Sequence, residues 1–480
     1  MKERVKDNAM IVSAYQDDAL GSDDATAIAQ RIAGGEITAR EAVEAAIRRC
    51  EEVNPILNAV VTPCFERALE RADEAPDGAF AGVPTFIKDT DDAPGTPTRF
   101  GSLAVPPRVK ERASPFVKQF LSTGLISLGK TTLPEFGLTA TTESLLSGPT
   151  RNPWNPGYST SGSSGGSAAL VAAGVVPIAH GNDGGGSIRN PAACCGLVGL
   201  KPTRGRLVSM EGVERMPIAI VHQGVLTRTV RDTARFYASA ERYWRNPNLP
   251  PIGLVDAPGA RRLRMGIYTE AIKGSPCHPE TADAVMKAGA LCESLGHSVE
   301  PLPNHFDGRF ASDFLVFWGL MAYSIACFGR CMIGRGFDSS KLDPWTRGCV
   351  KLFTRNALKT PMVIRRLKRL GAAFNEIFQT YDVLVSPTVG HPPPPLGYLA
   401  PDVPFNEALE RIMKFSSFTP IHNISGTPAI SLPMGMNSEG LPIGVMFAAG
   451  WGRERTLLEL AFELEDAQPW PILKKPRRRA

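Results

Sequence analysis

The sequence predicts a single large α/β domain that spans residues 1–480. Three observations support this fold class. Strand-like and helix-like patterns alternate along the chain without an internal repeat. Hydrophobic residues make up 43% of the chain and charged residues 21%, which is ordinary globular composition with enough apolar residues for a core. No proline- or glycine-rich linker divides the chain, because its glycine-rich segments lie within motifs.

In the N-terminal part, local signals predict two helices followed by strands. Asp23 and Asp24 form a cap before a helix that Gly34-Gly35 ends. Thr38 and Glu41 form a capping box that begins a second helix, which we expect Asn54-Pro55 to stop. Residues 59–62 and 83–87 are apolar strand patterns, and the second ends at Lys88.

The C-terminal part continues the alternation. Residues 245–262 are rich in proline and predict a loop. Residues 263–268 and 381–385 predict buried strands, and 430–433 with 442–447 predict a final strand pair. Helices are expected over residues 279–295 and 453–467.

An apolar stretch and two basic stretches each have a structural and a functional interpretation. Residues 314–329 carry no charge, but a membrane-spanning helix needs about 20 residues, so a buried helix is expected. Its face with Phe314, Phe317, Trp318 and Met321 either lines an acyl-binding pocket or packs in the core. Residues 359–369 predict a solvated basic helix face rather than a membrane-docking one, and the basic tail 474–479 a solvated end.

Composition argues against several classes of function. A net charge of +5 is small for this length, so a nucleic-acid partner is not indicated. The nine cysteines show neither zinc-ligand spacing nor a disulfide pattern, so we expect reduced thiols, no metal, no cofactor and a cytoplasmic location. Residues 1–10 are charged and lack the apolar core of a signal peptide.

The segment 158–203 is the strongest candidate for a functional site. Two glycine-serine clusters, at residues 162–166 and 184–187, flank an apolar run, and Asp183 and Arg189 flank the second cluster. Glycine lets the backbone approach a ligand closely. A flexible linker would contain neither the apolar run nor the two charges.

Two other motif matches suggest different chemistry. Gly124-x-x-x-x-Gly129-Lys130-Thr131 has the P-loop pattern, but its four variable residues form an apolar strand pattern instead of a phosphate-binding turn. The residues 162–166 also fit the nucleophile elbow of α/β-hydrolases with Ser164 as nucleophile. That alternative needs an acid and a histidine, for which His391 and His422 are available, and it stays open here.

The chain closely resembles the amidase signature family of serine hydrolases. Residues 162–167 (GSSGGS), 183–191 (DGGGSIRNP) and 195–203 (CGLVGLKPT) follow the family signature, with Ser161 in place of the usual glycine. Residues 82–89 (GVPTFIKD), 423–433 (NISGTPAISLP) and 440–444 (GLPIG) resemble further family blocks. Within the family, residues 151–155 and 180–187 are similar to bacterial amidases and to the aminohexanoate cyclic-dimer hydrolase type.

The resemblance implies a catalytic triad and the groups that support it. Ser187 matches the nucleophile, Ser163 the bridging serine after a cis peptide bond, and Lys88 the base. A buried lysine loses its proton more easily, so a neutral amine could accept the proton that Ser163 relays from Ser187. The backbone N–H groups of Gly184, Gly185 and Gly186 would form the oxyanion hole. Asp183, Arg189 and Ser164 would support the site.

The implied function is hydrolysis of linear carboxylic amides through an acyl-enzyme, with release of a carboxylate and ammonia or an amine. The fold would be one mixed, twisted sheet covered by helices, with a signature core at about 80–205 and an acyl-pocket insert at about 300–380. We expect a small-molecule amide substrate and an alkaline optimum, without a nucleic-acid or membrane partner, and a homodimer is compatible. The alternatives are a glutaminase subunit of a tRNA-dependent amidotransferase, a hydrolase of cyclic amides or oligomers, and a catalytically idle binding protein.

Overall fold

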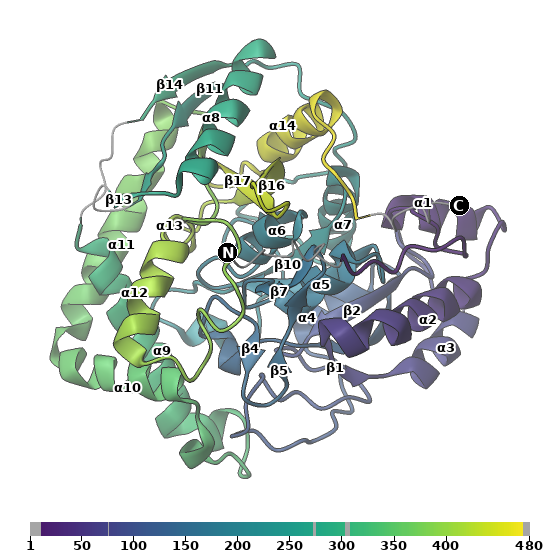
Figure 1. Ribbon diagram of the computed structural model, residues 1–480, viewed down its shortest axis with the longest axis horizontal. Helices are drawn as coiled ribbons and strands as arrows, with labels where there is room; N and C mark the ends of the chain where they lie inside the picture. The colour runs from purple at the N-terminus through teal and green to yellow at the C-terminus, as the bar shows by residue number, and fades with distance from the viewer. Residues whose placement is uncertain (1–10, 75, 272–274, 303–307, 474–480) are drawn as a thin grey trace, which may run out of the picture.

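The computed structural model describes residues 11–74, 76–271, 275–302 and 308–473, and its centre is a mixed eight-stranded sheet (Figure 1). The first three strands in the sheet order are mutually parallel and the others pair antiparallel. The α/β class with a mixed sheet is therefore confirmed. In sheet order the strands are β14 (Ser298–Pro301), β11 (Arg264–Ile267), β15 (Val383–Pro387), β17 (Pro442–Ala449), β16 (Ala429–Met436), β9 (Val198–Lys201), β10 (His222–Thr227) and β8 (Ile178–Asp183).

A three-stranded sheet lies against the β8 edge of the large sheet. Its strands are, in order, β1 (Val60–Pro63), β3 (Ile126–Thr131) and β2 (Pro84–Lys88). The hydroxyl of Thr85 in β2 donates to the carbonyl of Ile178 in β8 at 2.8 Å, so the two sheets meet at this point. Among the described residues, three strand pairs complete the β-structure: β4 (Glu143–Ser144) with β5 (Gly148–Pro149), β6 (Arg151–Asn152) with β7 (Asn155–Ser159), and β12 (Glu270–Ala271) with β13 (Ser275–Pro276).

Two short helices lie inside the protein. Every residue of α5 (Gly165–Ala172) and of α6 (Arg189–Cys195) is buried. A helix that is apolar all round is stable only when it is surrounded by other elements, which explains the position of α5. Each of the two glycine-serine clusters leads into one of these helices, so both clusters are held by the core.

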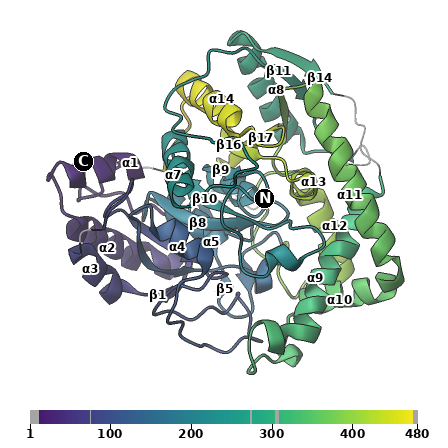
Figure 2. The same cartoon turned by 180° about the vertical axis from the view of Figure 1, so that it is seen from behind.

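The remaining helices cover the sheets in two groups at opposite ends of the molecule (Figures 1 and 2). One end holds α1 (Ala25–Ala33), α2 (Ala39–Leu57) and α3 (Phe65–Asp73). The other end holds α9 (Phe310–Met332), α10 (Pro344–Asn356), α11 (Thr360–Glu376), α12 (Phe405–Phe415) and α13 (Pro420–Ser425). Between them lie α4 (Pro115–Leu121), α7 (Val230–Tyr243), α8 (Pro279–Ser294) and α14 (Glu454–Ala467). The described residues also form the short 3-10 helices η1 (Glu135–Gly137), η2 (Val213–Arg215), η3 (Ser339–Lys341), η4 (Ala357–Lys359) and η5 (Ile377–Gln379).

The local predictions at the N-terminal end are confirmed with one exception. Both hydrogen bonds of the Thr38–Glu41 capping box are present. Strand β3 includes Gly129, Lys130 and Thr131, so the P-loop match is part of a strand. Pro55, however, does not stop α2, which continues to Leu57. Pro55 lies two residues before the helix end, so its missing N–H removes one hydrogen bond of the ladder, to the carbonyl of Glu51, and the turns before it stay intact.

Helix α9 is longer and less buried than the sequence suggests. It has 23 residues and is long and apolar enough to span a membrane by length and composition, yet only 33% of its most apolar window is buried. One face, with Phe317 and Ala322, is buried, whereas Phe328 and Met332 are exposed. The expectation of a buried helix is therefore correct for one face only. In α11, Val363 and Leu367 are buried and Arg365, Lys368 and Arg369 are exposed, as expected, whereas Arg366 is partly buried and pairs with Asp313 of α9. Residues 1–10 and 474–480 lie outside the described part of the chain.

Candidate active site

Lys88 and Ser163 contact each other although 75 positions separate them. Lys88 ends β2, and Ser163 lies in the loop before α5. The Nζ atom of Lys88 is 2.7 Å from the Oγ atom of Ser163, and the lysine is completely buried. Ser187, between β8 and α6, is 7% exposed and lines a cavity together with Gly162, the neighbour of Ser163. The structure therefore brings all three proposed triad residues to one region.

Burial controls the protonation of Lys88. Desolvation lowers the pKa of its ammonium group from 10.5 to about 7, although the negative charges of Asp183 and Asp91 act in the opposite direction. At neutral pH, Lys88 is consequently a neutral amine in a large fraction of the molecules. Besides Ser163, the Nζ atom contacts Ser164 Oγ at 2.9 Å and Asn182 Oδ1 at 2.7 Å, so Ser164 belongs to the network, as expected.

The loop before α5 has an unusual backbone. The peptide bond between Gly162 and Ser163 is cis, as the resemblance implies. A Cβ atom on Gly162 would lie 2.5 Å from the carbonyl oxygen of Thr141, so only glycine fits. Ser161, which replaces the usual glycine, has φ of 63°, and its hydroxyl donates to the carbonyl of Ala140 at 3.1 Å. A positive φ favours glycine, and this hydrogen bond stabilises the serine in that backbone conformation.

The peptide group between Gly185 and Gly186 is held from both sides. The Gly186 N–H donates to Asp183 Oδ1 at 2.7 Å, and the Gly185 carbonyl accepts from the hydroxyl of Thr419 at 2.6 Å. Gly186 has φ of 136°, and a Cβ atom there would be 2.4 Å from Thr419 Oγ1. Within the described structure, the N–H groups of Gly184, Gly185 and Ser187 have no protein acceptor. The N–H of Gly186 donates to Asp183 instead, and the oxyanion role of Gly186 stays a prediction.

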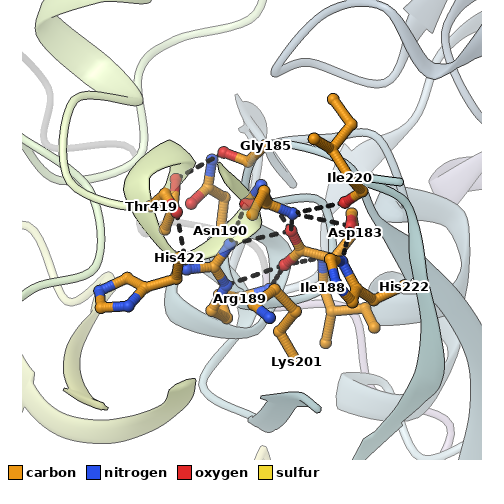
Figure 3. A network of polar contacts seen from close by, with 12 residues as sticks. Asp183, Gly185, Ile188, Arg189, Asn190, Lys201, Ile220, His222, Thr419 and His422 are labelled. Carbon is orange, nitrogen blue, oxygen red and sulfur yellow. Dashed lines mark hydrogen bonds and ion pairs between the residues drawn. The ribbon is translucent and has the colours of Figure 1, made fainter. Parts of the chain in front are cut away.

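A buried network around Asp183 and Arg189 supports this loop (Figure 3). Two guanidinium nitrogens of Arg189 each donate to the Asp183 carboxylate at 2.9 Å, and neither side chain is exposed. Asn423 donates to Asp183 Oδ1 at 2.9 Å and accepts from Arg189 at 2.7 Å. Burial alone would raise the pKa of Asp183, but the charge and hydrogen bonds of Arg189 hold it well below its usual range. The expected ion pair is present, and Asp183 stays ionised at neutral pH.

A mostly apolar cavity of about 630 Å³ opens onto Gly185 and Ser187. Phe314 and Trp318 of α9 line it, as expected for an acyl pocket. Phe317 and Met321 do not: Phe317 is 1% exposed and belongs to a core cluster against which Met321, Phe314 and Trp318 pack. The expected pocket face was therefore too wide. The cavity side of α9 comprises Phe310, Ala311, Phe314, Leu315 and Trp318, and Phe317 lies to one side of this face.

Two indole groups hold Leu138 in the lining of the cavity. Trp318 and Trp345 each donate their Nε1–H to the carbonyl oxygen of Leu138, at 2.9 and 2.8 Å. The neighbouring Gly137 lies so close to Ser163 that a Cβ atom would be 3.0 Å from its Oγ atom. Sequence reasoning missed Trp345, Thr419 and Asn182. No local signal marks the first two, because their partners lie far away in the chain, whereas Asn182 directly precedes the Asp183 motif.

The nucleophile-elbow alternative lacks the required contacts. Ser164 Oγ is buried and contacts Lys88 and the carbonyl of Asn182 rather than a histidine. His391 contacts Pro392, and His422 contacts Thr427. His180 has a structural position, because its Nδ1 atom accepts the backbone N–H of Lys88 at 3.2 Å and its ring packs on Phe116. Ser164 as the elbow nucleophile is therefore wrong.

Comparisons with known proteins give one consistent result. The model of the Amidase family matches residues 41–458. A protein of Mycobacterium leprae named as a presumptive amidase, AmiC, is 48% identical over 96% of this chain and 98% of its own length. The solved structure of a 6-aminohexanoate cyclic dimer hydrolase has a TM-score of 0.85 and 34% identity over 94% of this chain and 98% of that chain. A bacterial aryl acylamidase of the amidase signature family has a TM-score of 0.80 and 26% identity over 93% and 96%. Together with the geometry of the site, these similarities show that the chain belongs to the amidase signature family and is an amidohydrolase.

Proposed function

We propose that Ser187 is the nucleophile, Ser163 the proton relay and Lys88 the base of this amidase. The observation that carries the proposal is the 2.7 Å contact between Lys88 Nζ and Ser163 Oγ in a buried site that favours the neutral amine. As Ser187 Oγ attacks the amide carbon, its proton passes to Ser163, and Ser163 gives its own proton to Lys88. The base thus acts through one intervening hydroxyl.

The tetrahedral intermediate places a negative charge on the former carbonyl oxygen. The N–H groups of Gly184, Gly185 and Ser187 are the donors we assign to it, because none has a protein acceptor in the described structure. Collapse of the intermediate breaks the C–N bond, and the proton returns from Lys88 through Ser163 to the leaving nitrogen. Water then attacks the acyl-enzyme and gives a proton through Ser163 to Lys88. As the bond between the acyl carbon and Ser187 Oγ breaks, that proton returns through Ser163 to Ser187, and the acid leaves and ionises to the carboxylate.

The substrates that fit the cavity are amides whose acyl group is uncharged and mainly apolar. Its charged wall residues Glu410 and Lys414 pair with each other at 2.8 Å and are 69% and 66% exposed, so they provide no buried partner for a substrate charge. A glutamine substrate would place an ammonium and a carboxylate group in the cavity, which costs several kcal/mol without partners. The cavity therefore argues against the glutaminase alternative. Hydrolysis of cyclic amides is the second candidate, supported by the similarity to the cyclic-dimer hydrolase.

Labelling with a fluorophosphonate probe tests the nucleophile directly, with mass spectrometry to identify the modified peptide. We expect one adduct on Ser187 that is lost in Ser187→Ala and strongly slowed in Lys88→Ala. Ser164→Ala is the matched control, because it removes a neighbouring hydroxyl and leaves the adduct in place. An adduct on any other residue, or equal labelling of Lys88→Ala, would contradict the proposal.

A substrate panel tests the acyl preference. Hexanamide, an aryl anilide, glutamine and the cyclic dimer of 6-aminohexanoate would be compared by kcat/KM. We expect turnover of the neutral apolar amides and none of glutamine. Efficient glutamine hydrolysis would contradict the proposed substrate class, whereas the assignment of Ser187 as the nucleophile does not depend on this result.

A further inference from the structure

We propose that Asn182 is a positioning residue that turns the lone pair of the Lys88 amine toward Ser163. Asn182 lies in β8, directly before Asp183, and is 6% exposed. Its Oδ1 atom is 2.7 Å from Lys88 Nζ, as close as Ser163 Oγ. The inference rests on the proposed role of Lys88 as the base and adds a residue that acts through that amine.

The directions of the hydrogen bonds follow from counting protons. A neutral amine has two N–H groups and one lone pair, and Lys88 Nζ has three side-chain oxygens within 2.9 Å. The Oδ1 atom of Asn182 can only accept, and the hydroxyl of Ser164 donates to the backbone carbonyl of Asn182 at 3.3 Å. Both therefore accept the N–H groups of Lys88. Ser163 is left as the neighbour that faces the lone pair and can deliver a proton to it.

The orientation of the Asn182 amide is determined by its other neighbour. Its Nδ2 atom donates to Thr90 Oγ1 at 2.7 Å. The single hydroxyl proton of Thr90 goes to Asp91 Oδ2 at 3.0 Å, so Thr90 must act as the acceptor toward Asn182. Gln223 also donates to Asp91, at 3.0 Å, which keeps the carboxylate in place. An exchange of the amide oxygen and nitrogen would thus set two acceptors against each other at Thr90 and two donors against each other at Lys88.

An amide at this position supplies an acceptor without a charge. The charged and titratable groups around the amine are Asp183 and Asp91, which favour its protonated form, His180, whose pKa burial lowers to about 4, and Lys130, which is paired with Asp89. A carboxylate within hydrogen-bond distance would add a much stronger attraction for the proton. An opposite charge at such a distance shifts a pKa by about 1–3 units. The lysine would then remain protonated at neutral pH and could not accept the proton.

Asn182→Asp tests this reasoning through the pH dependence of fluorophosphonate labelling at Ser187. We expect the rising limb of the labelling rate to move up by about 1–3 pH units, with labelling at pH 7 about 5- to 500-fold slower and recovery at high pH. Asn182→Leu, of similar size but without an acceptor, should label more slowly at every pH without an upward shift of the limb. Thr90→Val removes the group that orients the amide and leaves Lys88 Nζ untouched, and we expect it to behave like Asn182→Leu.

The outcomes separate this inference from the proposed function. An unshifted limb in Asn182→Asp, or wild-type labelling in both Asn182→Leu and Thr90→Val, would overturn the role of Asn182. If Asn182→Asp does not fold, Thr90→Val decides the question, because this variant introduces no charge. Slower labelling of Thr90→Val then supports the role of Asn182, and labelling at the wild-type rate overturns it. Wild-type protein that is not labelled at Ser187, or labelling that does not depend on Lys88, would instead overturn the proposed mechanism itself.

Discussion

The substitution Asp183→Asn removes the negative charge that Arg189 faces in the core. Neither side chain of the pair is exposed, and two hydrogen bonds of 2.9 Å join them. Arg189 would keep Asn423 and the carbonyl of Thr419 as acceptors, but its charge would be unbalanced. Removing one partner of a buried ion pair costs about 3–5 kcal/mol, because the other charge stays buried without compensation.

This free energy can be expressed as a change in melting temperature. An unfolding entropy of about 2.1 cal/mol/K per residue gives about 1 kcal/mol/K for a chain of this length. The substitution should therefore lower Tm by about 3–5 °C, which differential scanning calorimetry at pH 7 measures. Turnover should fall as well, since Asp183 also holds the N–H of Gly186 next to the nucleophile.

Asp283→Asn is the matched control, with the same substitution in an ion pair on the surface. Asp283 and Lys287 are 2.7 Å apart on α8, and their side chains are 63% and 75% exposed. Such a pair contributes about 0.3–0.5 kcal/mol to the free energy of unfolding, so Asp283→Asn should change the Tm of the protein by less than about 1 °C. Equal effects of the two substitutions would refute the reasoning that burial makes the Asp183–Arg189 pair essential.

Three further predictions concern the base and the cavity. The labelling rate at Ser187 should rise with pH through about 7, because burial lowers the pKa of Lys88 and only the neutral amine accepts a proton; a profile centred near pH 5 would count against this base. Trp345→Phe should lower the unfolding free energy by about 0.5–1.5 kcal/mol through loss of its bond to Leu138, while an unchanged urea midpoint would show that Trp318 alone suffices. Phe314→Ala should enlarge the cavity and raise the relative kcat/KM for bulky acyl groups, and an unchanged substrate ranking would remove Phe314 from the pocket.

Motifs with short-range physical causes could be predicted from the sequence. The capping box at Thr38, the strand that ends at Lys88 and the strand pattern within the P-loop match all depend on neighbouring residues. The triad candidates were found because the glycine-serine clusters and the lysine motif resemble family patterns. Pro55 shows the limit of such rules, since a proline signal indicates the end of a helix only to within a few residues.

The sequence by itself determined the α/β class and the amidase family, and it predicted Lys88, Ser163 and Ser187 as the triad candidates. Only the tertiary structure decided which distant side chains hold the loops around these candidates. Thr419 reaches Gly185 across 234 positions and Trp345 reaches Leu138 across 207, and no local pattern encodes such contacts. The exclusion of Phe317 and Met321 from the cavity likewise depends on how α9 packs against its neighbours, because helical periodicity defines a face but not the partner it meets.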